Sequence, residues 1–167
     1  MAAAVLLIAG CEYEAPLVTE PTIPIDAEFL GLWKLVPEEG VAPEEDARLI
    51  VARYSDTEYL IHYPTNDEGI YYRGYPIQIG SKACVQLEAI GTAEGPVDAD
   101  EKGLFHVVSY AITNGTLDVW LLNEKVVSDD YKTSEELRAV FLENIDHPDL
   151  FKDAVGRFQR ARREEEK

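Results

Sequence analysis

The stretch that decides the fold is LFHVVSYAITNGTLDVWLL, residues 104–122. Two runs rich in β-branched and aromatic residues flank Asn114-Gly115, and both turn positions of a two-residue hairpin need residues that accept positive φ. The segment therefore predicts two antiparallel strands joined by a tight turn.

Upstream of this hairpin, further strand-like runs recur at hairpin spacing. In the run ACVQLEAIG, the apolar residues Val85, Leu87 and Ala89 alternate with Gln86 and Glu88, as in a half-buried strand. Seven or eight strands in series favour a mainly β fold, an antiparallel up-and-down β-barrel, with a β-sandwich or an α+β fold as alternatives. The other runs lie in residues 29–40, 48–64, 70–80 and 125–131.

The C-terminal part changes to a helical pattern. Thr133-Ser134-Glu135-Glu136 fits a capping box, in which Thr133 is the N-cap and Glu136 reaches back to it. His147-Pro148 should end this first helix, and a second helix is predicted from about Pro148 to Arg162. The domain division that follows is a β-barrel at 29–131 and C-terminal helices packed on it at 132–167. The second helix would bury Leu150, Phe151, Val155 and Phe158.

The chain opens with an apolar run that resembles no part of the barrel pattern. Ala2 to Gly10 carry no charge, and the run is shorter than the roughly 20 residues of a membrane-spanning helix. Two small residues precede Cys11, and acids and proline follow it. This arrangement predicts a signal peptide at 1–10 and a mature chain that begins at Cys11.

Leu7-Ile8-Ala9-Gly10-Cys11 resembles the lipobox of bacterial lipoproteins, although MAAAV lacks the Lys or Arg usual in such signals. In that family the cysteine thiol receives a diacylglycerol and the signal is removed. The resemblance implies a lipid anchor at Cys11, incorporation of palmitate, and a place in the bacterial cell envelope. Since Glu12 and not Asp follows, it implies the outer membrane, facing the periplasm, in a Gram-negative cell.

Residues 11–28 form the connection between this anchor and the strands. Three prolines and five acids in residues 12–28 disfavour a helix. Two interpretations are open. The segment is either an extended tether that lifts the domain off the membrane, or an arm that packs on the domain through Leu17, Val18, Ile23 and Ile25.

Gly31-Leu32-Trp33 stands in the first strand-like run, ahead of the others. It resembles the Gly-x-Trp signature of lipocalins and their calycin relatives, whose Thr-Asp-Tyr motif is absent here. The resemblance implies an eight-stranded barrel that Gly31 and Trp33 help to close at one end. It also implies a basic residue beside the tryptophan, for which Arg138 is the candidate.

A barrel of this size has an interior filled by side chains or a cup for one small ligand. Aromatic residues of the predicted strands are the candidates to line such a cup, and the alternative is that they are ordinary core residues. His62 and His106 are also placed in strands, where they could converge in the lumen. The candidate ligand-binding aromatics are Tyr59, Tyr63, Tyr71, Tyr75, Tyr110 and Trp120.

The formal net charge of −17 disfavours nucleic-acid binding, which needs Lys and Arg to neutralise phosphates. The charge is uneven, because residues 12–101 hold 19 acids and 5 bases. Such a balance is explained by solubility, or by a surface that attracts a cationic protein.

Chemistry-bearing motifs are sparse. The sequence contains no phosphate-binding loop, no nucleophile elbow and no paired zinc histidines. Asp98–Gly103 begins like a calcium loop, but Lys102 and Ser109 occupy positions that need oxygen ligands from carboxylates. Cys84 shares a strand face with Gln86 and Glu88, which predicts partial exposure and a thiol pKa raised by acidic neighbours.

The sequence as a whole predicts a binding protein, without enzyme activity, metal or cofactor. It is expected to be a membrane-anchored envelope lipoprotein whose lipocalin-like barrel binds a small apolar ligand. The alternative function is an acidic lipoprotein that binds a cationic protein partner in the envelope.

Overall fold

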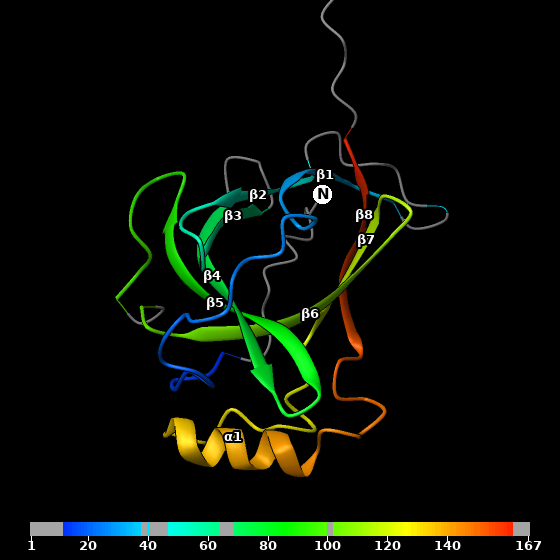
Figure 1. The fold of residues 1–167 in the computed structure, drawn as a ribbon. Helices are drawn as coiled ribbons and strands as arrows, with labels where there is room; N and C mark the ends of the chain where they lie inside the picture. Colours follow the sequence, from blue (N-terminus) through cyan, green and yellow to red (C-terminus); the bar gives the residue numbers. More distant parts are fainter. Residues whose placement is uncertain (1–11, 38–39, 41–46, 64–68, 100–101, 162–167) are drawn as a thin grey trace, which may run out of the picture.

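Eight antiparallel strands close into one barrel in the computed structural model (Figure 1). The structure describes residues 12–37, 40, 47–63, 69–99 and 102–161, so the predictions for the signal peptide and Cys11 lie outside the described residues. The predicted antiparallel barrel is confirmed, and both the sandwich and the α+β alternative are wrong. The strands are β1 (Gly31–Leu35), β2 (Arg48–Arg53), β3 (Tyr59–Tyr63), β4 (Ile70–Ile79), β5 (Lys82–Thr92), β6 (Phe105–Thr113), β7 (Thr116–Leu121) and β8 (Asp153–Arg160).

The connections between strands alternate between short and long. Residues 54–58, 80–81 and 114–115 make short turns, whereas residues 36–47, 64–69, 93–104 and 122–152 make longer connections. Because neighbouring strands are antiparallel, the two sets lie at opposite ends of the strands. The turn at 80–81 is the exception in space, because Gly80 lies against Leu142 and Ile145 of the 122–152 connection (Figure 1). We call the end with the turns at 54–58 and 114–115 the short-turn end, and the opposite end the long-loop end.

The hairpin that was the strongest signal in the sequence is confirmed. Asn114 and Gly115 have φ of +52° and +79°, as a two-residue turn of this type requires. Thr113 and Thr116 pair directly beside the turn. The hairpin fixes the register of β6 and β7, and with it which of their side chains face the interior.

One helix, α1 (Ser134–Glu143), lies in the connection between β7 and β8 and packs beneath the barrel near β4 (Figure 1). Its predicted capping box is present: the hydroxyl of Thr133 accepts the Glu136 N–H at 3.3 Å and donates to the Glu136 carboxylate at 2.8 Å. Leu137 and Phe141 are fully buried on its inner face. The short strand predicted at 125–131 is a region of turns instead.

The second predicted helix is wrong, because the segment forms β8. This strand pairs with β7 through Leu117↔Phe158 and with β1 through Leu35↔Phe158. It therefore satisfies the backbone groups of two strands that a helix would have left as open edges. The barrel extends to Arg160, and the predicted boundary at residue 131 separated its last strand from the other seven.

Residues 12–30 form an arm that packs on the barrel. Of the two interpretations of this segment, the packed arm is therefore correct and the free tether is wrong. Tyr13 exchanges two backbone hydrogen bonds with Phe105, of 2.8 and 2.9 Å. Tyr13, Ala15 and Leu17 are buried. The arm follows the outside of the barrel before it turns into β1 (Figure 1).

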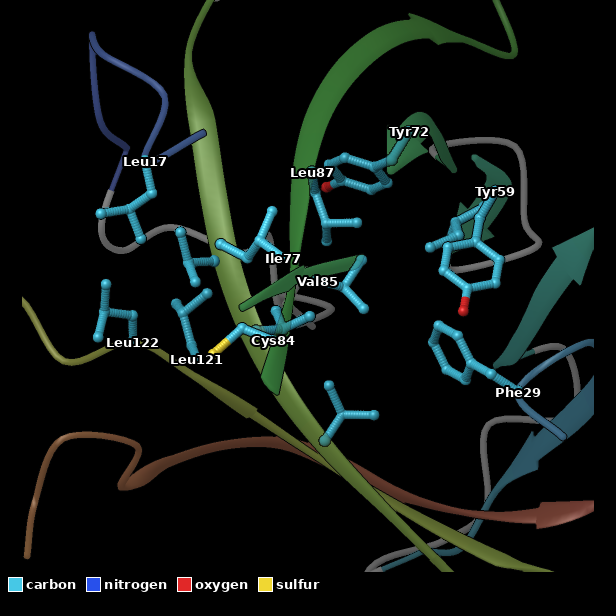
Figure 2. Close-up of a cluster of buried hydrophobic side chains, with 14 of the residues drawn as sticks. Leu17, Phe29, Tyr59, Tyr72, Ile77, Cys84, Val85, Leu87, Leu121 and Leu122 are labelled. Atoms are coloured by element: carbon cyan, nitrogen blue, oxygen red, sulfur yellow. The ribbon is translucent and has the colours of Figure 1, made fainter. Parts of the chain in front are cut away.

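The described apolar residues form one core on both sides of the barrel wall. Inside the barrel, Val85 and Leu87 lie toward Tyr59 and Tyr72 (Figure 2). On the outer side of the same strand, Cys84 pairs with Ile77 of β4, and Leu17 of the arm belongs to the same cluster (Figure 2). The arm thus covers an outward face of β4 and β5 that would otherwise expose apolar side chains.

Candidate functional site: the barrel interior

The strand register defines one continuous inward face. Trp33 pairs with Leu49, Val51 with Ile61, Leu87 with His106, and Leu117 with Phe158. The rings of Tyr63 and Phe158 lie 5.6 Å apart, although β3 and β8 are not neighbouring strands. This contact therefore crosses the lumen. The remaining buried residues on the inward face are Tyr59, Tyr72, Val85, Val108, Val119 and Leu121.

Phe29 plugs the short-turn end of the lumen. Its ring stacks on Tyr110 of β6 at 4.4 Å between centroids and meets Tyr59 of β3 edge-on at 5.2 Å. Its carbonyl accepts a hydrogen bond of 3.0 Å from the indole nitrogen of Trp33. A single buried side chain from the arm thus bridges strands on two sides of the barrel.

Arg160 reinforces this closure from the last strand. Its guanidinium carbon lies 4.2 Å from the centre of the Trp33 ring. One guanidinium nitrogen donates to the carbonyl of Leu30 at 2.8 Å, and the other donates to the carbonyl of Glu28. A basic residue does lie beside Trp33, as the resemblance implied, and that residue is Arg160. The predicted partner, Arg138, is wrong, because it is exposed on α1.

Gly31 is required beside this cation. Its φ of +142° is a conformation that residues with a side chain rarely adopt. A Cβ atom at this position would lie 2.8 Å from a guanidinium nitrogen of Arg160. The Gly-x-Trp signature thus has a physical cause in this chain: the glycine makes room for the arginine that covers the tryptophan.

A polar cluster lies next to the plug. The Tyr110 hydroxyl donates to a carboxylate oxygen of Asp26 at 2.8 Å, and the Asp26 backbone N–H donates to the Tyr59 hydroxyl at 2.7 Å. Burial, followed by the hydrogen bond to Asp26, raises the pKa of Tyr110 well above its usual value. Burial also raises the pKa of Tyr59. Both phenols therefore stay protonated at neutral pH and hold the arm in place.

The structure divides the six aromatic residues predicted to line a cup. Tyr59, Tyr63 and Tyr110 face the interior. The other three face outward: Tyr71 stacks on His62, Tyr75 donates to the carbonyl of Val18 in the arm, and Trp120 pairs with Ser109 on the outer face.

Placing Tyr71, Tyr75 and Trp120 in the lumen was wrong, because strand residues alternate between faces and the register was unknown. Sequence reasoning missed Tyr72, which is inward and buried. Because consecutive strand residues face opposite sides, the sequence did indicate that only one of Tyr71 and Tyr72 could face the interior. The register shift at this point inserts Ile90 into β5 and leaves the alternation within β4 intact.

The two strand histidines do not converge. His106 faces the lumen, where its ring meets Tyr72 edge-on at 6.0 Å, and its Nε2 lies 3.9 Å from a carboxylate oxygen of Glu12. His62 lies on the outer face, stacked at 4.0 Å on Tyr71. Burial lowers the pKa of His62, whose Nε2 has no hydrogen-bond partner among the described residues.

The long-loop end of the interior carries both polar and apolar side chains, because Leu49 of β2 and Leu121 of β7 lie there beside His106 and Tyr63. His106 follows directly after the first residue of β6 and Tyr63 is the last residue of β3, so both lie at the long-loop end. Val51, Leu117 and Phe29 line the interior nearer the short-turn end. Groups that can form hydrogen bonds therefore lie at both ends: Tyr63 and His106 at the long-loop end, and the Tyr59–Tyr110 pair at the plug.

Cys84 is buried and free, which corrects the expectation of partial exposure. Burial raises its pKa to about 12, and the nearby Lys82 lowers it by less. The acidic neighbours expected to raise the pKa are not the cause. A thiol in this state is a packing residue and not a nucleophile.

Within the part of the chain that the structure describes, no group of three or more His, Cys, Asp or Glu side chains is placed to hold a metal ion. The described residues also include no helix that is long and apolar enough to cross a membrane. Comparisons with protein-family models, with curated proteins and with solved structures give no match for this chain.

Proposed function

We propose that the chain is a ligand-binding lipoprotein of the cell envelope, whose barrel takes up one small, mainly apolar molecule. The observation that supports this function most directly is the closure of the barrel at its short-turn end. Phe29, Trp33 and Arg160 close the short-turn end with stacked rings and hydrogen bonds. A barrel closed at one end and lined by apolar side chains is the usual form of a cup for a small ligand.

The anchor is proposed from Leu7-Ile8-Ala9-Gly10-Cys11. Each buried CH₂ of an acyl chain contributes about 0.8 kcal/mol, and stable attachment takes more than one chain. A cysteine carrying a diacylglycerol meets that condition. Such an anchor does not depend on attraction between an acidic protein and anionic headgroups, which a net charge of −17 opposes.

Ligand binding is tested by native mass spectrometry of the protein purified from cells, with a lumen-filling variant as comparison. Ile61→Trp adds volume on the inward face of β3, and Leu60→Trp adds the same volume on the outer face. A co-purifying mass should persist in Leu60→Trp and disappear in Ile61→Trp. If both variants melt as the wild type does and both keep the mass, the lumen is not the binding site.

Lipidation is tested separately by growing cells with labelled palmitate. The wild type and Cys84→Ala should take up the label, and Cys11→Ala should not. Cys84→Ala is the matched control because it removes the other cysteine of the chain. Label that persists in Cys11→Ala would end the lipoprotein proposal.

A second candidate function is binding of a cationic protein. The observation that favours it is a group of exposed acids on α1 and its flanks: Asp129, Asp130, Glu135, Glu136, Glu143 and Asp146. Such a contact would weaken as salt screens it. Capture of a basic partner that is equally strong at about 0.05 and 0.5 M salt would exclude an electrostatic contact of this kind.

A further inference from the structure

We propose that the anchor holds the long-loop end of the barrel against the bilayer, so that ligand passes directly between the bilayer and the lumen. This inference rests on the proposed function, because it takes the acyl chains on Cys11 and a binding lumen as given. It adds the orientation of the barrel, the surface that meets the membrane and the source of the ligand.

The first step is the place where the arm begins. Tyr13 is held by two backbone hydrogen bonds to Phe105, the first residue of β6. Its hydroxyl donates at 2.8 Å to the carbonyl of Val127, in the long connection between β7 and β8. Both partners belong to the long-loop end. The ring of Tyr13 is fully buried, so this attachment is part of the folded core.

The second step is the course of the arm. Val18 is held midway by the side chain of Gln86, which accepts from its N–H at 3.2 Å and donates to its carbonyl at 3.0 Å. Asp26 then reaches Tyr59 and Tyr110 beside the plug. The arm therefore runs along the barrel from the long-loop end to the short-turn end. Its first described residues lie at the end opposite the plug, and Cys11 directly precedes them in the sequence.

The third step is the length of the leash, by which we mean the chain from the proposed anchor at Cys11 to Tyr13, which backbone hydrogen bonds hold on the barrel. Cys11 precedes Tyr13 by two residues, which span at most about 7 Å even when extended. The headgroup region adds roughly 5–8 Å to each side of the hydrocarbon core. With the acyl chains in the hydrocarbon, Tyr13 therefore lies within or directly above the headgroups. The barrel cannot turn its long-loop end far from the membrane without breaking the contacts of Tyr13.

The interior matches such a route. The end that would face the bilayer carries Tyr63, Tyr72 and His106 on its inner wall, and the wall between them and the Tyr59–Tyr110 pair is mainly apolar. An amphiphile with one chain fits such a wall, with its head group near Tyr63, Tyr72 and His106 and its chain among the apolar side chains. The ligand class that follows is a single-chain amphiphile dissolved in the membrane.

Charge at this end does not set the orientation. Glu12 and Glu14 stand at the start of the arm, and Glu14 is paired with Lys132 at 2.8 Å. Acids near a membrane are repelled by anionic headgroups, an effect that salt screens. An orientation imposed by the short leash should therefore be the same at low and high ionic strength.

Orientation is tested with the lipidated full-length protein in phosphatidylcholine vesicles that contain nitroxide-headgroup lipid. Lys102→Cys and Thr113→Cys place a fluorescent maleimide at exposed positions before the start and at the end of β6, whose 9 residues span about 30 Å. Nitroxide should quench the label at 102 several-fold more than the label at 113. Equal quenching, or stronger quenching at 113, overturns the proposal.

A leash variant gives the matched control. Twelve Gly and Ser residues inserted between Cys11 and Glu12 keep both the anchor and the folded arm, so this variant should fold as the wild type does. The difference in quenching between positions 102 and 113 should vanish in it. Transfer of a pyrene-labelled fatty acid from the vesicles to the protein should slow by about tenfold or more, which is our expectation for a route that needs direct contact.

The affinity of the detergent-extracted protein for the same fatty acid separates the two proposals. If the wild type does not bind it, the proposed ligand class fails whatever the orientation. If the wild type binds it but the long leash leaves quenching and transfer unchanged, lumen binding stands and the membrane-facing orientation is wrong.

Discussion

The guanidinium of Arg160 covers the ring of Trp33 at 4.2 Å and donates to the carbonyls of Leu30 and Glu28. One side chain of the last strand thus binds both the first strand and the arm that precedes it. The contact combines a cation–π interaction with two charge-assisted hydrogen bonds.

Arg160→Lys should destabilise the protein by about 1–3 kcal/mol, because a lysine cannot stack its head group flat on the indole and donate in two fixed directions. The midpoint of urea unfolding measures the effect. Arg157→Lys is the control, since Arg157 is 64% exposed and pairs with Asp118 on the surface. It should change stability by about 0–1 kcal/mol. An equal loss of stability in the two variants would show that the packing of Arg160 on Trp33 adds nothing to stability.

Gly31→Ala should cost more stability than Gly95→Ala. The two glycines have similar φ, +142° and +149°, but a Cβ at Gly95 meets nothing within 4 Å, whereas one at Gly31 meets Arg160 at 2.8 Å. Both variants carry backbone strain of about 1–3 kcal/mol. The excess in Gly31→Ala, read from thermal unfolding, isolates displacement of the arginine. Matching melting temperatures would contradict it.

Cys84 should react with thiol reagents about a thousandfold more slowly in the folded protein at pH 8 than in urea, since its pKa is about 12 against an ordinary value of 9.0. Leu17→Ala, which removes a buried side chain of the arm from the cluster that contains Cys84, should speed the reaction (Figure 2). Val36→Ala is the control, because Val36 is already 38% exposed. Rapid labelling of the folded wild type would mean that the arm does not cover Cys84.

Stability should fall as the pH rises above about 10, the ordinary pKa of a phenol. Burial raises the pKa of Tyr110 and of Tyr59, so the folded state keeps protons that the unfolded state has lost. This contribution is complete below the unfolded pKa and is lost above it. Tyr110→Phe should flatten the decline in unfolding free energy between pH 9 and 11. Tyr54→Phe, at a side chain that is 60% exposed, should not.

Local signals predicted the parts of the fold that local contacts make. The turn at Asn114-Gly115 depends on two residues, and the cap at Thr133 depends on a side chain three residues away. Both follow from backbone preferences that act without the rest of the chain. Turn spacing likewise predicted the first seven strands and their antiparallel order, but the last strand was expected at 125–131 and is β8 instead.

Long-range contacts decided what the sequence did not reveal. Phe151, Val155 and Phe158 have helical spacing, but the segment is a strand because β1 and β7 both need a partner. Arg160 was missed as the partner of Trp33 for the same reason, since it lay in the segment assigned to a helix. The faces of Tyr71, Tyr75 and Trp120 depended on register, which a single strand does not specify.

Closure between β1 and β8 also sets when the protein can fold. The strand that completes the barrel is made last, and it must find a partner near the other end of the sequence. Folding through such distant pairings is slow, because loop-closure entropy opposes the contacts until both ends meet. Until Arg160 has left the ribosome, the chain lacks the strand that joins β7 to β1, which leaves it time for the export that the proposed function requires.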